Sequence, residues 1–208
     1  MHAWLWTLIV CWTYSGMAQR SLTRGATMTD ARDGHVYRVI EIGGNSWFAE
    51  NLAYLPTVGD GIWVYGYEGG DVAEAKKTTE YREFGALYDW QTAMRSCPAE
   101  WHLASDEEWG RMEGGLGVSE AKLGEVWQGT DQGTRLKVGG DTGFNVRLAG
   151  WRGGRGFNFK GEHANFWTAT AVGEKAHERL FSAKRTNVGR DIGDKNAAFS
   201  VRCVKTRR

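Results

Sequence analysis

Two cysteines, Cys97 and Cys203, limit how this chain can fold more than any other feature of the sequence. The chain opens with a hydrophobic leader, residues 1–18, that ends in Gly-Met-Ala directly before Gln19. Small residues one and three positions before a cleavage point are typical of a signal peptide. Export delivers a chain to an oxidising compartment, where two thiols normally form one disulfide. We therefore expect a bond between Cys97 and Cys203 that joins the middle of the chain to its last strand.

The leader also carries a third cysteine, Cys11, which cleavage would remove. A lipoprotein cysteine needs a small residue before it, and Val10 stands there instead. An uncleaved membrane anchor is the other alternative, but the apolar run of about a dozen residues is shorter than the roughly 20 that a spanning helix needs. We expect a cleaved signal peptide over residues 1–18 and no transmembrane segment in the mature chain.

Length and charge predict one exported domain without a nucleic-acid partner. Cleavage leaves about 190 residues, a usual size for a single domain. The net charge is +1 with acids and bases interspersed, so no field that attracts polyanions is expected. We predict a flexible lead-in over residues 19–30, one domain over 31–205 and a basic tail over 206–208. The expected location is the periplasm, the outer membrane or the extracellular space.

The first part of the domain has the pattern of a β-hairpin. Residues 35–42 are rich in β-branched and aromatic side chains, and a Gly-Gly-Asn turn separates them from a second such run at 46–50. Residues 56–82 are turn-rich and polar, with an apolar island only at 62–65.

Two helices follow in the sequence pattern. The first is predicted from apolar residues at helical spacing, which would share one buried face that ends before Pro98. The second begins at Ser105, whose hydroxyl caps the helix while Glu108 reaches back in a capping box. The expected buried side chains are Leu87, Trp90, Met94 and Cys97 in the first helix and Trp109, Met112 and Leu116 in the second.

The last part of the chain combines a long loop region with three strands. Residues 117–161 are glycine-punctuated and loop-like, interrupted by an apolar run at 144–149. Strands are predicted over 166–170, 178–182 and 198–204. In the last of these, Cys203 shares a side with Phe199 and Val201, which places it toward the core.

Seven short motifs follow one another along the chain in a distinctive order. They are Asp33–Tyr37, Trp47–Leu52, Gly85–Trp90, Cys97-Pro98, Trp101–Trp109, Phe166–Thr170 and Phe199–Lys205. In these motifs the chain resembles the Fibrobacter succinogenes major paralogous domain, a family of exported bacterial domains. The resemblance covers about residues 31–205 and implies a C-type-lectin-like fold. That fold is α+β, with two helices, short and mostly antiparallel sheets, a long glycine-rich loop region and one disulfide.

The sequence lacks the side chains that sugar-binding calcium sites or catalysis would need. Sugar-binding C-type lectins hold calcium with an acid beside a strand tryptophan, whereas Trp167 here follows Asn165-Phe166. Asp131, Asp141 and Glu162 are scattered, and nothing in their spacing brings them together. The histidines do not lie at metal-ligand spacing. The acids Asp106-Glu107-Glu108 are explained as the first turn of a helix, where the helix dipole favours them. We predict no catalytic residue, no metal and no cofactor.

Aromatic and basic residues of the glycine-rich region are the candidate binding residues. Exposed tryptophan rings stack on the apolar faces of sugars, and arginine binds hydroxyls or carboxylates. The alternative is that the rings fill the core beneath irregular loops, as large aromatics usually do. The candidates are Trp127, Trp151, Arg152, Arg155, Phe157 and Phe159.

These observations predict an exported, non-enzymatic binding module that recognises a glycan or a cell-envelope partner through its long-loop face. The alternative is a structural or accessory subunit of an outer-membrane or cell-surface protein complex. An enzyme acting on polysaccharide would need two carboxylates roughly 5–10 Å apart across a cleft.

Overall fold

The computed structural model describes residues 25–119 and 126–206. The predicted signal peptide, with Cys11, lies outside these residues, as do residues 207–208 of the predicted tail. The described chain is a mixed α/β structure of few helices and several small antiparallel sheets. No helix within the described ranges has the length and apolarity needed to cross a membrane.

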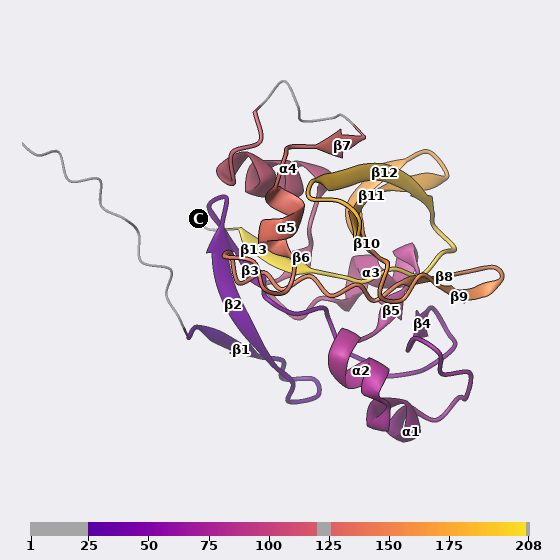
Figure 1. Ribbon diagram of the computed structural model, residues 1–208. Helices are drawn as coiled ribbons and strands as arrows, with labels where there is room; N and C mark the ends of the chain where they lie inside the picture. Colours follow the sequence, from indigo (N-terminus) through magenta and orange to yellow (C-terminus); the bar gives the residue numbers. More distant parts are fainter. Residues whose placement is uncertain (1–24, 120–125, 207–208) are drawn as a thin grey trace, which may run out of the picture.

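The strands form four sheets in which neighbours pair antiparallel (Figure 1). Their bounds are β1 (Thr27–Thr29), β2 (Val36–Ile42), β3 (Asn45–Phe48), β4 (Ile62–Trp63), β5 (Leu87–Tyr88), β6 (His102–Leu103), β7 (Trp127–Gln128), β8 (Trp151–Gly153), β9 (Gly156–Asn158), β10 (His163–Val172), β11 (Lys175–Ser182), β12 (Val188–Asp194) and β13 (Cys203–Thr206). The largest sheet has the order β1-β2-β3-β13-β6, the next has the order β10-β11-β12-β7, and β4-β5 and β8-β9 are pairs.

The helices are short and capped at their N-termini by side chains in four of five described cases. In Figure 1, α4 and α5 lie beside the four-stranded sheet, whereas α1 and α2 lie at the opposite end of the molecule. Their bounds are α1 (Val72–Lys77), α2 (Thr79–Phe84), α3 (Trp90–Ser96), α4 (Asp106–Gly115) and α5 (Gln132–Leu136). The two-helix expectation is therefore incomplete.

The hairpin and the second predicted helix are confirmed. Strands β2 and β3 pair as expected, with Ile40 opposite Trp47. Helix α4 has Ser105 as its N-cap and a complete capping box with Glu108. Trp109 and Met112 are fully buried on its inner face. Local signals sufficed here because the hydrogen bonds that start the helix are made by neighbours in sequence.

The first predicted helix is wrong in its phase and in its start. Leu87 belongs to strand β5 and pairs with Trp63 of β4. The helix starts only at Trp90, because the carboxylate of Asp89 caps it by accepting the Thr92 N–H at 2.8 Å. Met94 consequently points to solvent with 45% exposure, and Cys97 lies just beyond the helix.

Three further expectations need correction. The predicted flexible lead-in includes β1, which pairs with β2, and Asp30, which is fully buried and bound to Arg32. The turn-rich region 56–82 contains α1 and most of α2. Strand β12 is an additional strand that the sequence did not predict. The last predicted strand, 198–204, is regular only from Cys203 onward.

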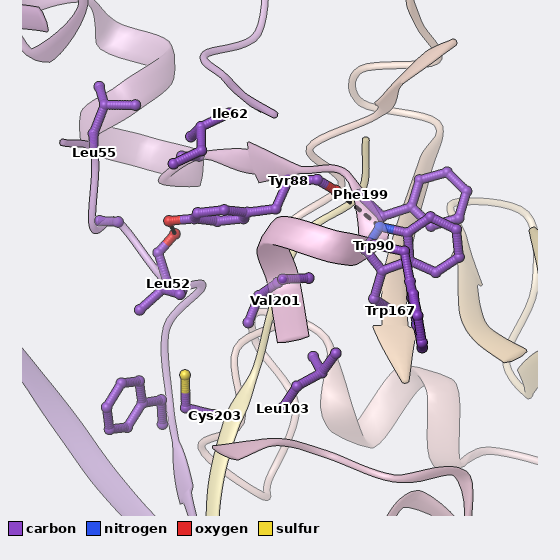
Figure 2. Packing of buried hydrophobic residues seen from close by; sticks show 14 of the residues in the cluster. Leu52, Leu55, Ile62, Tyr88, Trp90, Leu103, Trp167, Phe199, Val201 and Cys203 are labelled. Atoms are coloured by element: carbon purple, nitrogen blue, oxygen red, sulfur yellow. Dashed lines mark hydrogen bonds between the residues drawn. The ribbon is translucent and has the colours of Figure 1, made fainter. Parts of the chain in front are cut away.

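The interior consists of two hydrophobic clusters. The first surrounds Tyr88, Trp167 and Phe199, where the indole N–H of Trp167 donates to the Tyr88 carbonyl at 2.8 Å (Figure 2). The second surrounds Trp109 and Phe166, with edge and tilted ring contacts to Trp47, Phe144 and Phe181. Offset and edge-to-face ring pairs add to the stabilisation that burial of apolar area provides.

The predicted disulfide between Cys97 and Cys203 is confirmed, with the two Cα atoms 5.8 Å apart. It links the end of α3 to the first residue of β13. Cys203 is fully buried in the first cluster, beside Val201 and Leu103 (Figure 2). The bond thus fixes the last strand against the segment that enters β6.

Reduction of this disulfide should lower the free energy of unfolding by about 2–5 kcal/mol, because the tether closes a large loop in the unfolded chain. The bonded residues are 106 positions apart in sequence. Urea unfolding with and without dithiothreitol measures the change, and a Cys97→Ala/Cys203→Ala double variant should not respond to the reductant. Alkylation of both thiols in the native, unreduced protein would contradict the assignment.

Candidate functional site

The candidate site is built on the β8–β9 hairpin. Its base is fixed to the last segment of the chain, because Arg152 and Ala198 exchange two backbone hydrogen bonds of 3.0 and 2.8 Å. The Gly150 N–H donates to the His163 carbonyl at 2.8 Å and ties the hairpin to β10. Its turn, Gly154-Arg155, is exposed. A rigid base with a projecting turn is a usual way to present binding side chains.

One face of the hairpin gathers rings around a cation. Arg152 and Phe157 are cross-strand partners, so their side chains lie on the same face. The guanidinium carbon of Arg152 is 4.6 Å from the ring centre of Trp63 and 5.8 Å from that of Phe157. The ring of Phe157 lies 5.0 Å from Tyr65, over which Lys160 places its ammonium at 5.4 Å. We call Trp63, Tyr65, Arg152, Phe157 and Lys160 the Arg152 face.

The other face of the hairpin packs toward the protein. Trp151 makes an edge contact with the buried ring of Phe199 and stacks with Phe159, both at 6.2 Å. Phe159 in turn stacks on His163 at 5.1 Å. Phe159 has φ of 61° and remains 46% exposed. This row holds the hairpin against the fold and leaves one ring in solvent.

The structure brings together five of the six predicted site residues. Trp151, Arg152, Arg155, Phe157 and Phe159 lie on or next to the hairpin, and none of them is buried. Trp127 is separate from them, because it lies on β7 at the far edge of the four-stranded sheet from β10. Its ring lies 4.2 Å from the Arg185 guanidinium.

A hollow of about 530 Å³ adjoins the Arg152 face and shares Lys160 with it. Its volume is in the range of small-ligand sites. Helix α2 forms one wall, and residues 137–148 form most of the other. The lining residues are Thr79, Glu80, Glu83, Phe84, Lys137, Val138, Val146, Arg147, Leu148, Lys160 and Gly161.

The two carboxylates of the hollow are neutralised by cations. Glu80 accepts from Lys160 at 2.8 Å, and this hydrogen bond lowers the pKa of Glu80. Glu83 accepts from Arg147 at 3.0 Å. Both acids belong to α2, so they line one wall and do not face each other across a cleft.

Sequence reasoning missed Trp63 and Tyr65 as site residues. A signal was present, because residues 62–65 alternate as in a strand. Ile62 and Val64 are buried with 3% and 0% exposure, whereas Trp63 and Tyr65 are only half-buried. A short apolar island with two large rings on the same side therefore indicated a half-exposed edge.

The acids at the start of α4 all have structural partners. Burial tends to raise the pKa of Asp106, but hydrogen bonds and charges from Arg190 and Arg179 outweigh it and lower the pKa to about 2. Glu107 accepts from Arg111 at 2.5 Å, and Glu108 completes the capping box. The helix-dipole interpretation was thus incomplete, because Asp106 also attaches α4 to β11 and β12.

The remaining metal and base candidates do not assemble into a site within the described ranges. No three His, Cys, Asp or Glu side chains there are placed to hold a metal ion. Asp141 pairs instead with Arg135 at 3.0 Å. His102 lies 2.9 Å from a carboxylate oxygen of Glu108 and so belongs to the capping of α4.

Glu178 on β11 is a buried carboxylate outside the hairpin. It accepts from the side-chain amide of Asn165 at 2.7 Å, and only 6% of it is exposed. Burial raises its pKa to about 7, with a further contribution from Asp191 on the neighbouring strand. The amide oxygen of Asn165 is buried without a hydrogen-bond partner in the described structure.

Comparison with known proteins identifies the family. The sequence profile of the Fibrobacter succinogenes major domain matches residues 40–205, so the chain belongs to this family. The match confirms the resemblance that the motifs indicated and spans the hairpin, the hollow and both cysteines. No curated protein and no solved structure matches the chain.

The free energy of unfolding should fall by up to about 3 kcal/mol between pH 5 and pH 8. In this interval the Glu178 carboxylate ionises, and burial makes its charged form less favourable in the folded protein than in the unfolded chain. Its pKa rises from the ordinary 4.5 to about 7 in the folded state, so the loss begins above the first value and is complete above the second. Glu178→Gln should be more stable than wild type at pH 8, and its amide can donate to Asn165. Equal losses in wild type and Glu178→Gln, measured by urea unfolding, would contradict this.

Proposed function

We propose that this protein is an exported, non-enzymatic module that binds a glycan on the Arg152 face and in the adjoining hollow. The observation that carries the proposal is the pair of half-buried rings of Trp63 and Phe157 at the Arg152 guanidinium, with the half-buried ring of Tyr65 next to Phe157. Aromatic rings held at fixed positions stack on the C–H faces of sugar rings, and nearby cations bind polar substituents. The hollow supplies a depression into which a chain of sugars can continue.

A glycan fits this surface better than a protein partner does. Protein-docking surfaces present contiguous apolar patches of several hundred Å². The large exposed apolar side chains of the described residues come instead from scattered segments. They are Val36, Met94, Val126, Val138, Phe159, Val172 and Ile192. The structural or accessory subunit is therefore the second proposal.

The arrangement of acids supports binding rather than hydrolysis. Glycosidases place two carboxylates on opposite sides of the scissile bond. Glu80 and Glu83 lie on one helix, and each already accepts a hydrogen bond from a cation. Neither is arranged to work as an acid or a base across the hollow.

We further propose that the fold is C-type-lectin-like and that the protein is exported to the periplasm, outer membrane or cell surface. A disulfide joining the end of α3 to the last strand, together with several small antiparallel sheets, supports this fold. The leader sequence and the disulfide support export. No cofactor is part of the proposal.

Removal of a ring from the Arg152 face should weaken saccharide binding by about three- to tenfold, since each stacked ring contributes modestly. The protein is first screened on a glycan array, and the best saccharide is then titrated by calorimetry. Trp63→Ala and Phe157→Ala should both bind more weakly. Binding of no saccharide, or equal affinity in all variants, would contradict the proposal.

Two matched controls locate the site. Trp127→Ala removes a ring next to an arginine at the far edge of the sheet and should keep full affinity. Phe159→Asn removes the exposed ring on the other side of the hairpin, with a residue that tolerates positive φ. Loss of binding in Phe159→Asn alone would move the site to that side. A stoichiometric complex with an identified envelope protein that Phe157→Ala disrupts would favour the accessory subunit.

A further inference from the structure

Arg152 differs from Arg147, Arg179 and Arg190 because its charge has no partner in the described chain. Arg147 and Arg190 form ion pairs with Glu83 and Asp106 at 3.0 and 2.8 Å. Arg179 binds Asp106 and Glu113 at 2.6 and 2.7 Å. Arg152 makes no side-chain hydrogen bond or ion pair with any described residue, and its Nε is buried without an acceptor.

The position of this guanidinium is nevertheless fixed. Its backbone is held by both hydrogen bonds to Ala198, and its planar group lies against the rings of Trp63 and Phe157. Contact with the two rings orients the guanidinium and leaves its terminal N–H groups free of hydrogen bonds to the described part of the protein. An arginine held in this way loses little conformational freedom when a planar or tetrahedral anion binds its N–H groups in a bidentate manner.

The surrounding charges leave this end of the site positive. Arg155 at the turn is a second cation that makes no ion pair with the described residues. Glu80, the acid of the adjoining hollow that contacts Lys160 of the Arg152 face, is neutralised by that lysine. A neutral ligand would gain no ionic interaction from these two arginines, whereas an acidic one would satisfy Arg152 and be attracted by Arg155.

We propose that the ligand is an acidic saccharide and that Arg152 binds its anionic substituent, a carboxylate or a sulfate ester, while Trp63 and Phe157 contact the sugar rings. This inference rests on the proposed function and adds the chemical class of the glycan. The substituent is recognised at the guanidinium, and the adjoining hollow holds the rest of the saccharide.

The test compares ligands that differ only in charge. Short oligogalacturonates, the same oligomers as methyl esters, and sulfated and unsulfated galactan oligosaccharides are titrated into the unchanged protein. The charged member of a pair should bind about tenfold to a hundredfold more tightly, and added salt should reduce the difference. Preference for the carboxylate pair or for the sulfate pair supports the proposal and identifies the substituent.

Two variants assign the preference to its residue. Arg152→Gln should bind an acid and its ester equally, while Arg185→Gln should keep the preference, although Arg185 also lies over a tryptophan ring.

Equal binding of charged and uncharged ligands by the unchanged protein overturns this inference and leaves glycan binding intact. Binding of no saccharide overturns the proposed function itself. Loss of the preference in Arg185→Gln but not in Arg152→Gln removes Arg152 from the site. The ligand comparison needs no variant, so it stands even if Arg152→Gln fails to fold.

Discussion

The fold depends on how its last segment is held at the centre of the molecule, and Arg202 shows this most clearly. Arg202 is 1% exposed and donates to Asn51 Oδ1 and to the carbonyls of Phe48, Phe144 and Asn145, at 2.6 to 3.1 Å. Burial without a paired acid lowers its pKa to about 9. The side chain thereby joins the end of β3 to the loop before β8. Since a buried charge left without these acceptors would be costly, the surrounding segments are required to come together.

Most other charges near the core are used to connect elements. Asp106 accepts from two arginines on neighbouring strands, and Glu113 at the other end of α4 accepts from one of them. Helix α4 is thus attached to the four-stranded sheet at both ends. The hairpin departs from this rule, because Arg152 is held by rings. Sites that bind ligands are often where local satisfaction of polar groups is incomplete.

The sequence was informative where neighbouring residues decide the structure and uninformative where distant ones do. The capping box of α4 and the β2–β3 hairpin follow from local pattern. Strand β12 could not be seen, because its glycines suggest a loop. A Cβ at Gly189 would meet the ring of Trp127 at 3.1 Å, and one at Gly193 would meet the ring of Trp167 at 2.9 Å. These glycines admit packing partners that lie far away in sequence. Likewise, the binding candidates were predicted by residue type, but their separation into two faces and the distant position of Trp127 follow from strand pairing.

The hairpin is joined to the fold at its base, while its turn extends beyond the packed interior. A side chain added at Gly154 would meet no atom within 4 Å. Replacement of the turn residues therefore carries little penalty for folding, so the scaffold tolerates diversification there. Libraries that vary only this turn offer a route to new recognition properties on an otherwise unchanged framework.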